Sequence, residues 1–156
     1  MSPDIRTLLT DAQLATLRAG YSRAVMDTVA TAIVASPYPP AAGLTAFAGE
    51  RFYNDAPPTL APANRERCLL ALFCGGRRPA FAVAVHAYWA LMEGVAVDEV
   101  AEIVLLASLY GGIDVLTEGN HTLTLALTAL AQAANTGGTA VQSATVLPAL
   151  VAQFRQ

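Results

Sequence analysis

The sequence predicts an all-α fold, a single-domain bundle of about six to seven helices, from three observations. Apolar residues recur at three- and four-residue intervals along most of the chain, the period of an amphipathic helix. No segment alternates with the period of a β-strand, and no Asn-Gly or Asp-Gly hairpin turn is present. Clusters of proline and glycine separate the apolar segments, and 156 residues suit one domain with its own core.

Residues 1–58 are predicted to form an N-terminal helical extension. Its first helix starts at Thr10 and continues through regularly spaced apolar positions to Ile33. Thr10 and Gln13 have the spacing of a capping box, in which each side chain bonds a backbone N–H of the other residue. The prolines of "SPYPP" end this helix because proline lacks the N–H that a helix needs, and a short helix is expected over residues 41–53.

The third and fourth predicted helices carry most of the polar residues of interest. The third begins with Pro62, which suits the first helical position, and continues through "NRERCLLALFC" until Gly75 and Gly76. The fourth runs from about Pro79 to Glu93 and ends at Gly94, since glycine readily takes the left-handed conformation of a helix cap. Its nearly continuous apolar sequence predicts a buried helix.

The fifth predicted helix begins near Val97 and ends at Gly111-Gly112. Asp98 and Glu99 occupy its first turn, where carboxylates complement the helix dipole.

Two further helices complete the prediction. Asp114 is placed to cap a sixth helix that continues to about Ala134. Thr139 and Gln142 can cap a final helix, which Pro148 weakens.

The composition predicts a soluble protein with more apolar surface than one subunit can bury. Hydrophobic residues make up 54% of the chain and charged residues 13%, against about a quarter charged in a typical domain. A membrane-spanning helix needs about 20 consecutive apolar residues. The longest apolar run, Pro79 to Met92, is shorter and lies between charged residues, so no membrane partner is expected. We expect homo-oligomerisation to cover the surplus.

Charge and the N-terminal sequence limit partners and location. The net charge of -3 is mild, and no basic stripe or aromatic platform favours nucleic-acid binding. The N-terminus lacks the basic and apolar regions of a secretory signal, which favours a cytoplasmic location.

Three blocks of sequence resemble a known family. "NRERCLLALF", "HAYWALMEGV" and "VDEVAEIVLLASLYGG" are similar, in order and spacing, to the core of the carboxymuconolactone decarboxylase and alkylhydroperoxidase D family. The resemblance assigns residues 60–135 to the family-like core and residues 139–156 to a C-terminal helix. It implies an all-helical subunit that assembles into a trimer or hexamer, with a pocket for a small-molecule substrate near the histidine.

The chain departs from both reactions of this family. In the peroxidase branch a Cys-x-x-Cys pair precedes the histidine, and those positions hold Pro79 and Ala82 here. In the decarboxylase branch a glutamate precedes the histidine by about one turn, and Ala82 occupies that position too. Peroxidase activity is therefore not expected, and the reaction stays open.

His86 is the candidate proton-transfer residue. It matches the family's catalytic histidine, and a buried imidazole can exchange a proton near neutral pH. The alternative is a core histidine that bonds a backbone carbonyl or a carboxylate. Glu66, which matches a glutamate of the family, or Glu102 is expected to orient His86. The alternatives are a solvated helix-start carboxylate for Glu66 and a salt bridge to Arg65 or Arg67 for Glu102.

Further residues are candidates for substrate binding. Trp89 and Tyr110 are expected to line an apolar pocket near His86, and His121 would be a distinctive feature if it faced the same cavity. Cys68 and Cys74 are too far apart in one helix to form a disulfide. Both can be small buried hydrophobic residues, or one can be a reactive thiol that faces the pocket.

No metal and no cofactor is expected. The two histidines lack the spacing of metal ligands, and "FCGGRRP" lacks the Lys-Ser/Thr ending of a phosphate-binding loop.

Three functions follow from the sequence. The first is a cofactor-independent enzyme that decarboxylates, isomerises or cyclises a small organic acid or carbonyl compound. The second is a non-catalytic helical oligomer that binds a ligand or a partner. The third is a thiol-dependent antioxidant protein that uses Cys68 or Cys74.

Overall fold

The structure, a computed structural model, describes residues 4–23 and 59–154, and all regular elements in these ranges are helical. The all-α prediction is therefore confirmed for this part of the chain. Six α-helices lie in it: α1 (Asp11–Gly20), α4 (Pro62–Gly75), α5 (Ala80–Met92), α6 (Val97–Gly111), α7 (Ile113–Thr136) and α8 (Ser143–Phe154). Two short 3-10 helices, η1 (Ile5–Thr7) and η3 (Gly138–Val141), complete the described elements.

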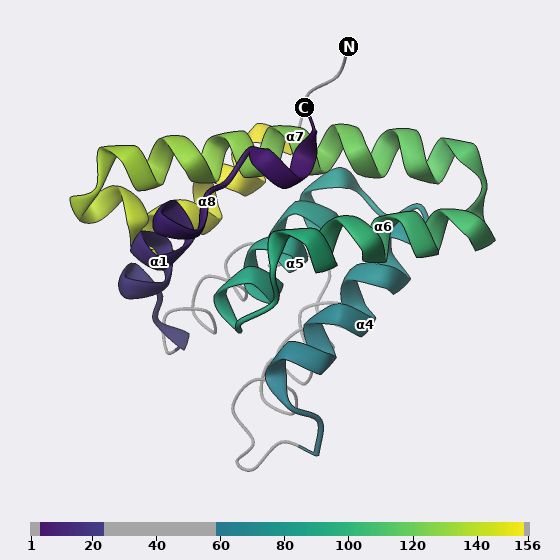
Figure 1. The fold of residues 1–156 in the computed structure, drawn as a ribbon, viewed down its shortest axis with the longest axis horizontal. Helices are drawn as coiled ribbons and strands as arrows, with labels where there is room; N and C mark the ends of the chain where they lie inside the picture. Colours follow the sequence, from purple (N-terminus) through teal and green to yellow (C-terminus); the bar gives the residue numbers. More distant parts are fainter. Residues whose placement is uncertain (1–3, 24–58, 155–156) are drawn as a thin grey trace, which may run out of the picture.

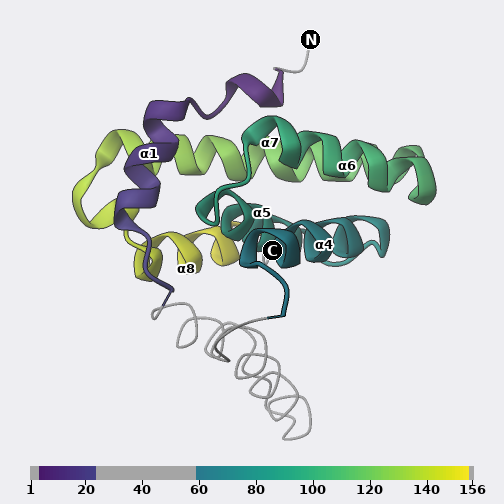
Figure 2. The same cartoon turned by 60° about the horizontal axis from the view of Figure 1, so that its bottom comes forward.

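The helices form two layers, and α5 lies in the middle of one of them (Figure 2). Figure 2 shows α6 and α7 side by side in one layer, with α4, α5 and α8 in the other. Figure 1 shows α1 and α8 at the same end of the long helix α7, opposite the end where α6 turns into α7. Because α5 contacts α4, α6, α7 and α8, it is the central helix of this part of the chain.

The sequence of α5 explains its central position. From Val83 to Met92 all side chains are buried except that of His86, which is partly buried. Helices that are apolar on all faces belong in a core. The prediction of a buried fourth helix is therefore confirmed, and the only histidine of α5 lies mostly inside the protein.

Capping and turn signals place several boundaries correctly. The capping box of Thr10 and Gln13 is formed, with both reciprocal hydrogen bonds present. Pro62 starts α4, and Gly112 ends α6 at a φ of 93°, a backbone conformation that favours glycine. Gly94, with a φ of 99°, follows α5 for the same reason.

The prediction of one long first helix is wrong, because α1 ends at Gly20 and Tyr21 has extended backbone. A Cβ on Gly20 would lie 2.5 Å from the carbonyl oxygen of Val141, so the backbone of η3 contacts α1 where only glycine fits. The break also turns the side chains of Tyr21 and Arg23 toward Glu93. The predicted helix over residues 41–53 lies outside the described residues.

Two predicted caps also differ from the structure. Asp114 lies within the first turn of α7, because Gly112 is the N-cap and the helix starts at Ile113. Thr139 belongs to η3, and α8 begins only at Ser143. Pro148 lies inside α8, where its missing N–H removes one helical hydrogen bond.

Within the described ranges, no helix combines the length and the apolar character needed to cross a bilayer.

Candidate functional site

His86 and Glu66 are in direct contact between α5 and α4. The imidazole Nδ1 of His86 lies 2.8 Å from Oε2 of Glu66, and the Glu66 side chain is 0% exposed whereas that of His86 is 12% exposed. An ionised carboxylate only accepts hydrogen bonds, so beside an ionised Glu66 it is the Nδ1–H of His86 that donates, and Nε2 is the ring nitrogen that does not contact Glu66. The histidine and the carboxylate named from the sequence therefore form a hydrogen-bonded pair, and their catalytic role stays a prediction.

The buried carboxylate of Glu66 has a second partner. Arg65 Nε donates to Glu66 Oε1 over 3.1 Å, and Arg65 is itself buried. A charge inside a protein is tolerated when it is paired and hydrogen-bonded. Both oxygens of Glu66 are bound in this way, which fixes the orientation of the carboxylate toward His86. The alternative of a solvated carboxylate at a helix start is contradicted, because Glu66 is fully buried.

Two aromatic rings enclose the imidazole. The ring of Phe73 stacks on His86 with a centroid distance of 4.6 Å and an angle of 28°, and the ring of Trp89 meets His86 edge-on at 5.0 Å. Trp89 is therefore next to the histidine, as the sequence predicts. The sequence analysis does not single out Phe73, although this residue lies seven positions after Glu66 and hence on the same face of α4.

Glu102 is not part of this cluster. It is exposed on α6 and forms no ion pair with a described residue. The expected salt bridge to Arg65 or Arg67 is absent because Arg65 pairs with Glu66 and Arg67 Nη2 contacts Glu99 Oε1 at 3.1 Å. Of the two predicted orienting carboxylates, only Glu66 contacts the histidine.

The other predicted binding residues are spread over the surface. Tyr110, at the end of α6, is 98% exposed and so lines no enclosed space within this chain. Cys68 is exposed and Cys74 is buried, and both are free thiols of the continuous helix α4, as the sequence predicts. Burial raises the pKa of the Cys74 thiol to about 11. The interpretation of both cysteines as buried residues is correct only for Cys74.

A second cluster surrounds the carboxylate of Glu93 at the C-terminal end of α5 and is called the Glu93 cluster. Glu93 Oε1 accepts hydrogen bonds from Tyr21 at 2.7 Å and from Arg23 Nη2 at 2.8 Å, and the side chain is 14% exposed. Burial, followed by the hydrogen bond to Glu93, raises the pKa of the Tyr21 phenol. An arginine and a tyrosine therefore compensate the negative charge of Glu93 at this helix end, where the helix dipole disfavours it.

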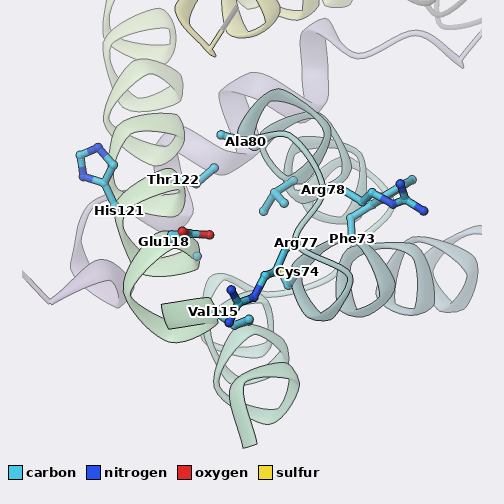
Figure 3. A pocket seen from close by; sticks show the side chains of 11 residues that line it. Phe73, Cys74, Arg77, Arg78, Ala80, Val115, Glu118, His121 and Thr122 are labelled. Atoms are coloured by element: carbon cyan, nitrogen blue, oxygen red, sulfur yellow. The ribbon is translucent and has the colours of Figure 1, made fainter. Parts of the chain in front are cut away.

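A cavity of about 190 Å³ lies between the α4–α5 turn and α7. Figure 3 shows Arg77 and Glu118 reaching toward this space, whereas the ring of His121 points away from it on the outer side of α7. His121 is among the residues that line this cavity and His86 is not, so the two histidines do not share it. The ring of Phe73 belongs to both places, because it lines the cavity and stacks on His86.

Neither a metal site nor a related protein assigns a function to His86 and Glu66. Among the described residues, no group of three or more His, Cys, Asp and Glu side chains is arranged to hold a metal ion. Comparisons of the chain with protein-family models, with curated proteins and with solved structures gave no match.

Proposed function

We propose that the protein is a cofactor-independent enzyme that decarboxylates, isomerises or cyclises a small organic acid or carbonyl compound. The observation that supports the proposal is the contact of a partly exposed imidazole with a fully buried carboxylate, Nδ1 of His86 to Oε2 of Glu66 at 2.8 Å. A buried carboxylate behind a histidine fixes its tautomer and orientation and stabilises the imidazolium that forms when the ring accepts a proton.

His86 would transfer the proton through Nε2. In an isomerisation, Nε2 takes a proton from the carbon next to a carbonyl, the electron pair of the C–H bond moves to the carbonyl oxygen, and the imidazolium returns the proton to another carbon of the enolate. In a decarboxylation, the electron pair of the breaking C–C bond forms the enolate as CO₂ leaves, and a protonated His86 supplies the proton to carbon. Both steps need only a group that exchanges protons near neutral pH.

The neighbours of His86 have supporting roles in this proposal. Glu66 is a positioning residue, since its carboxylate is held by Arg65 on one oxygen and by His86 on the other. Phe73 and Trp89 limit the access of water to the imidazole. Exclusion of water strengthens the electrostatic interactions that stabilise an enolate. The resemblance to carboxymuconolactone decarboxylases agrees with this chemistry, and membership of that family is part of the proposal.

Hydrogen–deuterium exchange tests the proposal without knowledge of the substrate. A panel of short α-keto and β-keto acids is incubated with the protein in D₂O, and loss of the proton next to the carbonyl and release of CO₂ are followed by NMR. We expect catalysed exchange or decarboxylation of at least one compound, with a rate at least about 100-fold lower in His86→Asn. Thermal unfolding of the variant verifies that it folds. Equal rates in His86→Asn and the wild type would exclude His86 as the catalytic group.

A second candidate function, a non-catalytic oligomer, is favoured by an exposed apolar face. This face, called the α6 face, consists of large side chains on α6 and at the start of α7: Leu105, Leu106, Leu109, Tyr110 and Ile113. Contiguous apolar patches on a protein surface often mark interfaces, and the excess of hydrophobic residues in the chain favours a second copy as the occupant. Sedimentation of the wild type and of Leu109→Glu tests this, since we expect the substitution to dissociate the assembly.

A further inference from the structure

The cavity between the α4–α5 turn and α7 is lined by a threonine whose hydroxyl forms no hydrogen bond with a described residue. Thr122 is 5% exposed, lines the cavity, and forms no hydrogen bond with any described residue. The other four threonines of α7 each donate to the carbonyl four residues before them: Thr117, Thr124, Thr128 and Thr136. The hydroxyl oxygen of Thr122 is open to solvent, because it is not among the buried side-chain atoms that lack a partner. Since Thr122 lines the cavity, this hydroxyl can bond a ligand there.

The positively charged side chain of Arg77 also lines this cavity. Figure 3 shows the side chain of Arg77 extending from the α4–α5 turn toward the space in front of α7. Its Nη2 is 3.5 Å from the carbonyl oxygen of Gly111 and from Oδ2 of Asp114. Both contacts are long and exposed, so they hold the guanidinium only weakly and leave it able to bind an anion.

The backbone at Arg77 is unusual for an arginine. The N–H groups of Arg77 and Arg78 bond the carbonyls of Cys74 and Phe73, which is the Schellman pattern at the end of a helix. In this pattern the residue with left-handed backbone is usually glycine, yet Arg77 has a φ of 49°. A side chain in this conformation costs the fold free energy. The sequence therefore keeps a guanidinium where glycine would be more stable.

The rest of the lining is mainly apolar. Phe73, Val83 and Val115 line the cavity, and the volume of about 190 Å³ is below the range of about 300–1,000 Å³ that holds drug-sized ligands. The Cys74 thiol also lines it, and burial raises the pKa of that thiol to about 11, so at neutral pH it stays uncharged and does not repel an anion.

We propose that this cavity binds a short-chain aliphatic monocarboxylate, with the carboxylate held by the Arg77 guanidinium and the Thr122 hydroxyl. The aliphatic part of the ligand packs against Phe73 and the two valines. A guanidinium binds both oxygens of a carboxylate, and a hydroxyl adds a third hydrogen bond. Glu118, which also lines the cavity, and the apolar side chains disfavour a phosphate dianion more than a monoanion. This site does not depend on the proposed function, because His86 does not line it.

The sole tryptophan of the chain can report binding. Phe73 lines the cavity and stacks on His86, and His86 contacts the edge of Trp89. A ligand that moves Phe73 therefore alters the surroundings of the indole. Trp89 fluorescence and isothermal titration calorimetry give two readouts, neither of which requires turnover.

The experiment titrates the full chain with butanoate and with butanamide, an uncharged compound of similar shape. We expect saturable binding of butanoate at one site and at least tenfold weaker binding of butanamide. Arg77→Gly is expected to weaken butanoate binding at least about tenfold while the midpoint of thermal unfolding stays equal or rises, because glycine relieves the backbone strain. Loss of binding in a variant of undiminished stability cannot be attributed to unfolding.

Two further variants complete the design. Thr122→Val keeps the shape of the side chain and is expected to weaken binding about fivefold through loss of one hydrogen bond. Arg67→Gln removes a positive charge from α4 outside the cavity and is expected to change the affinity less than about twofold. Absence of saturable binding in both readouts, equal affinities for the acid and the amide, or equal losses in Arg77→Gly and Arg67→Gln would overturn the proposal.

Discussion

Glu66 and Glu93 are two carboxylates with similar numbers of hydrogen-bond partners. Their ring partners differ, because Glu66 contacts an imidazole and Glu93 contacts a phenol. Each accepts hydrogen bonds from an arginine and from one ring side chain, His86 for Glu66 and Tyr21 for Glu93. Glu66 connects α4 to α5, whereas Glu93 connects the end of α5 to the segment after α1. The two clusters are therefore alike as links between elements of the fold.

The difference between the two clusters lies in the ring group that makes the hydrogen bond with each carboxylate. The hydrogen bond to Glu66 comes from an imidazole, which has a second ring nitrogen that can accept a proton. The hydrogen bond to Glu93 comes from a phenol whose pKa is raised by burial and by Glu93 itself, so the phenol keeps its proton at every physiological pH. A carboxylate held by an arginine thus has a partner with a second proton-accepting atom in one place and a partner that keeps its proton in the other.

The largest expected effect separates the two carboxylates by activity. Glu66→Gln replaces an acceptor of the Nδ1 proton with an amide and removes the charge that stabilises the imidazolium, so we expect catalysed deuterium exchange to fall about 100-fold or more. Glu93→Gln is the matched control, and we expect exchange within about twofold of the wild type in a folded protein. The pH profile of exchange distinguishes the roles, because only Glu66→Gln should shift it. Equal losses in both variants would remove the distinction between the clusters.

The two thiols of α4 differ in burial, because Cys68 is exposed and Cys74 is buried. With a pKa raised to about 11, Cys74 is about one-thousandth thiolate at pH 8, and its burial also limits access. We expect iodoacetamide to alkylate the exposed Cys68 at least about 100-fold faster than Cys74, as measured by peptide mass spectrometry. Rapid modification of Cys74, or consumption of thiols by peroxide at neutral pH, would instead favour a thiol-dependent function.

Removal of a single hydroxyl measures the structural role of the Glu93 cluster. Tyr21→Phe deletes a hydrogen bond to a carboxylate and is expected to lower the free energy of unfolding by about 1–2 kcal/mol in urea titrations. Tyr110→Phe removes an exposed hydroxyl and is expected to change the free energy of unfolding by less than about 0.5 kcal/mol. A similar effect in both variants would show that the contact with Glu93 adds no stability.

The smallest expected effect concerns an exposed carboxylate. Hydrogen bonds from the Ala96 N–H and from Arg67 hold the pKa of Glu99 below its ordinary value. Because the folded-state pKa is lowered, the stabilisation is present above the ordinary carboxyl pKa and is lost as the pH falls through the lowered value. We expect Glu99→Gln to cost a few tenths of a kcal/mol at pH 7 and less under strongly acidic conditions. A cost that does not vary with pH would contradict this.

The sequence predicts the elements of the described fold well, because their signals are local. Pro62, Gly94 and Gly112 mark helix ends by backbone geometry that depends on few neighbours. The end of α1 at Gly20 was not predictable in this way. It depends on the carbonyl of Val141, about 120 residues later, and no pattern near Gly20 records that contact.

By itself, the sequence determined that the described chain is helical, that α5 is buried, and that His86 is the one histidine within it. Only the tertiary structure decided that Glu66 rather than Glu102 contacts His86, that Phe73 stacks on it, and that Arg77 and Thr122 share a cavity. Helical period and capping follow from interactions within a few residues. Which faces of two helices meet depends on how all helices pack together, and that information is spread over the whole chain.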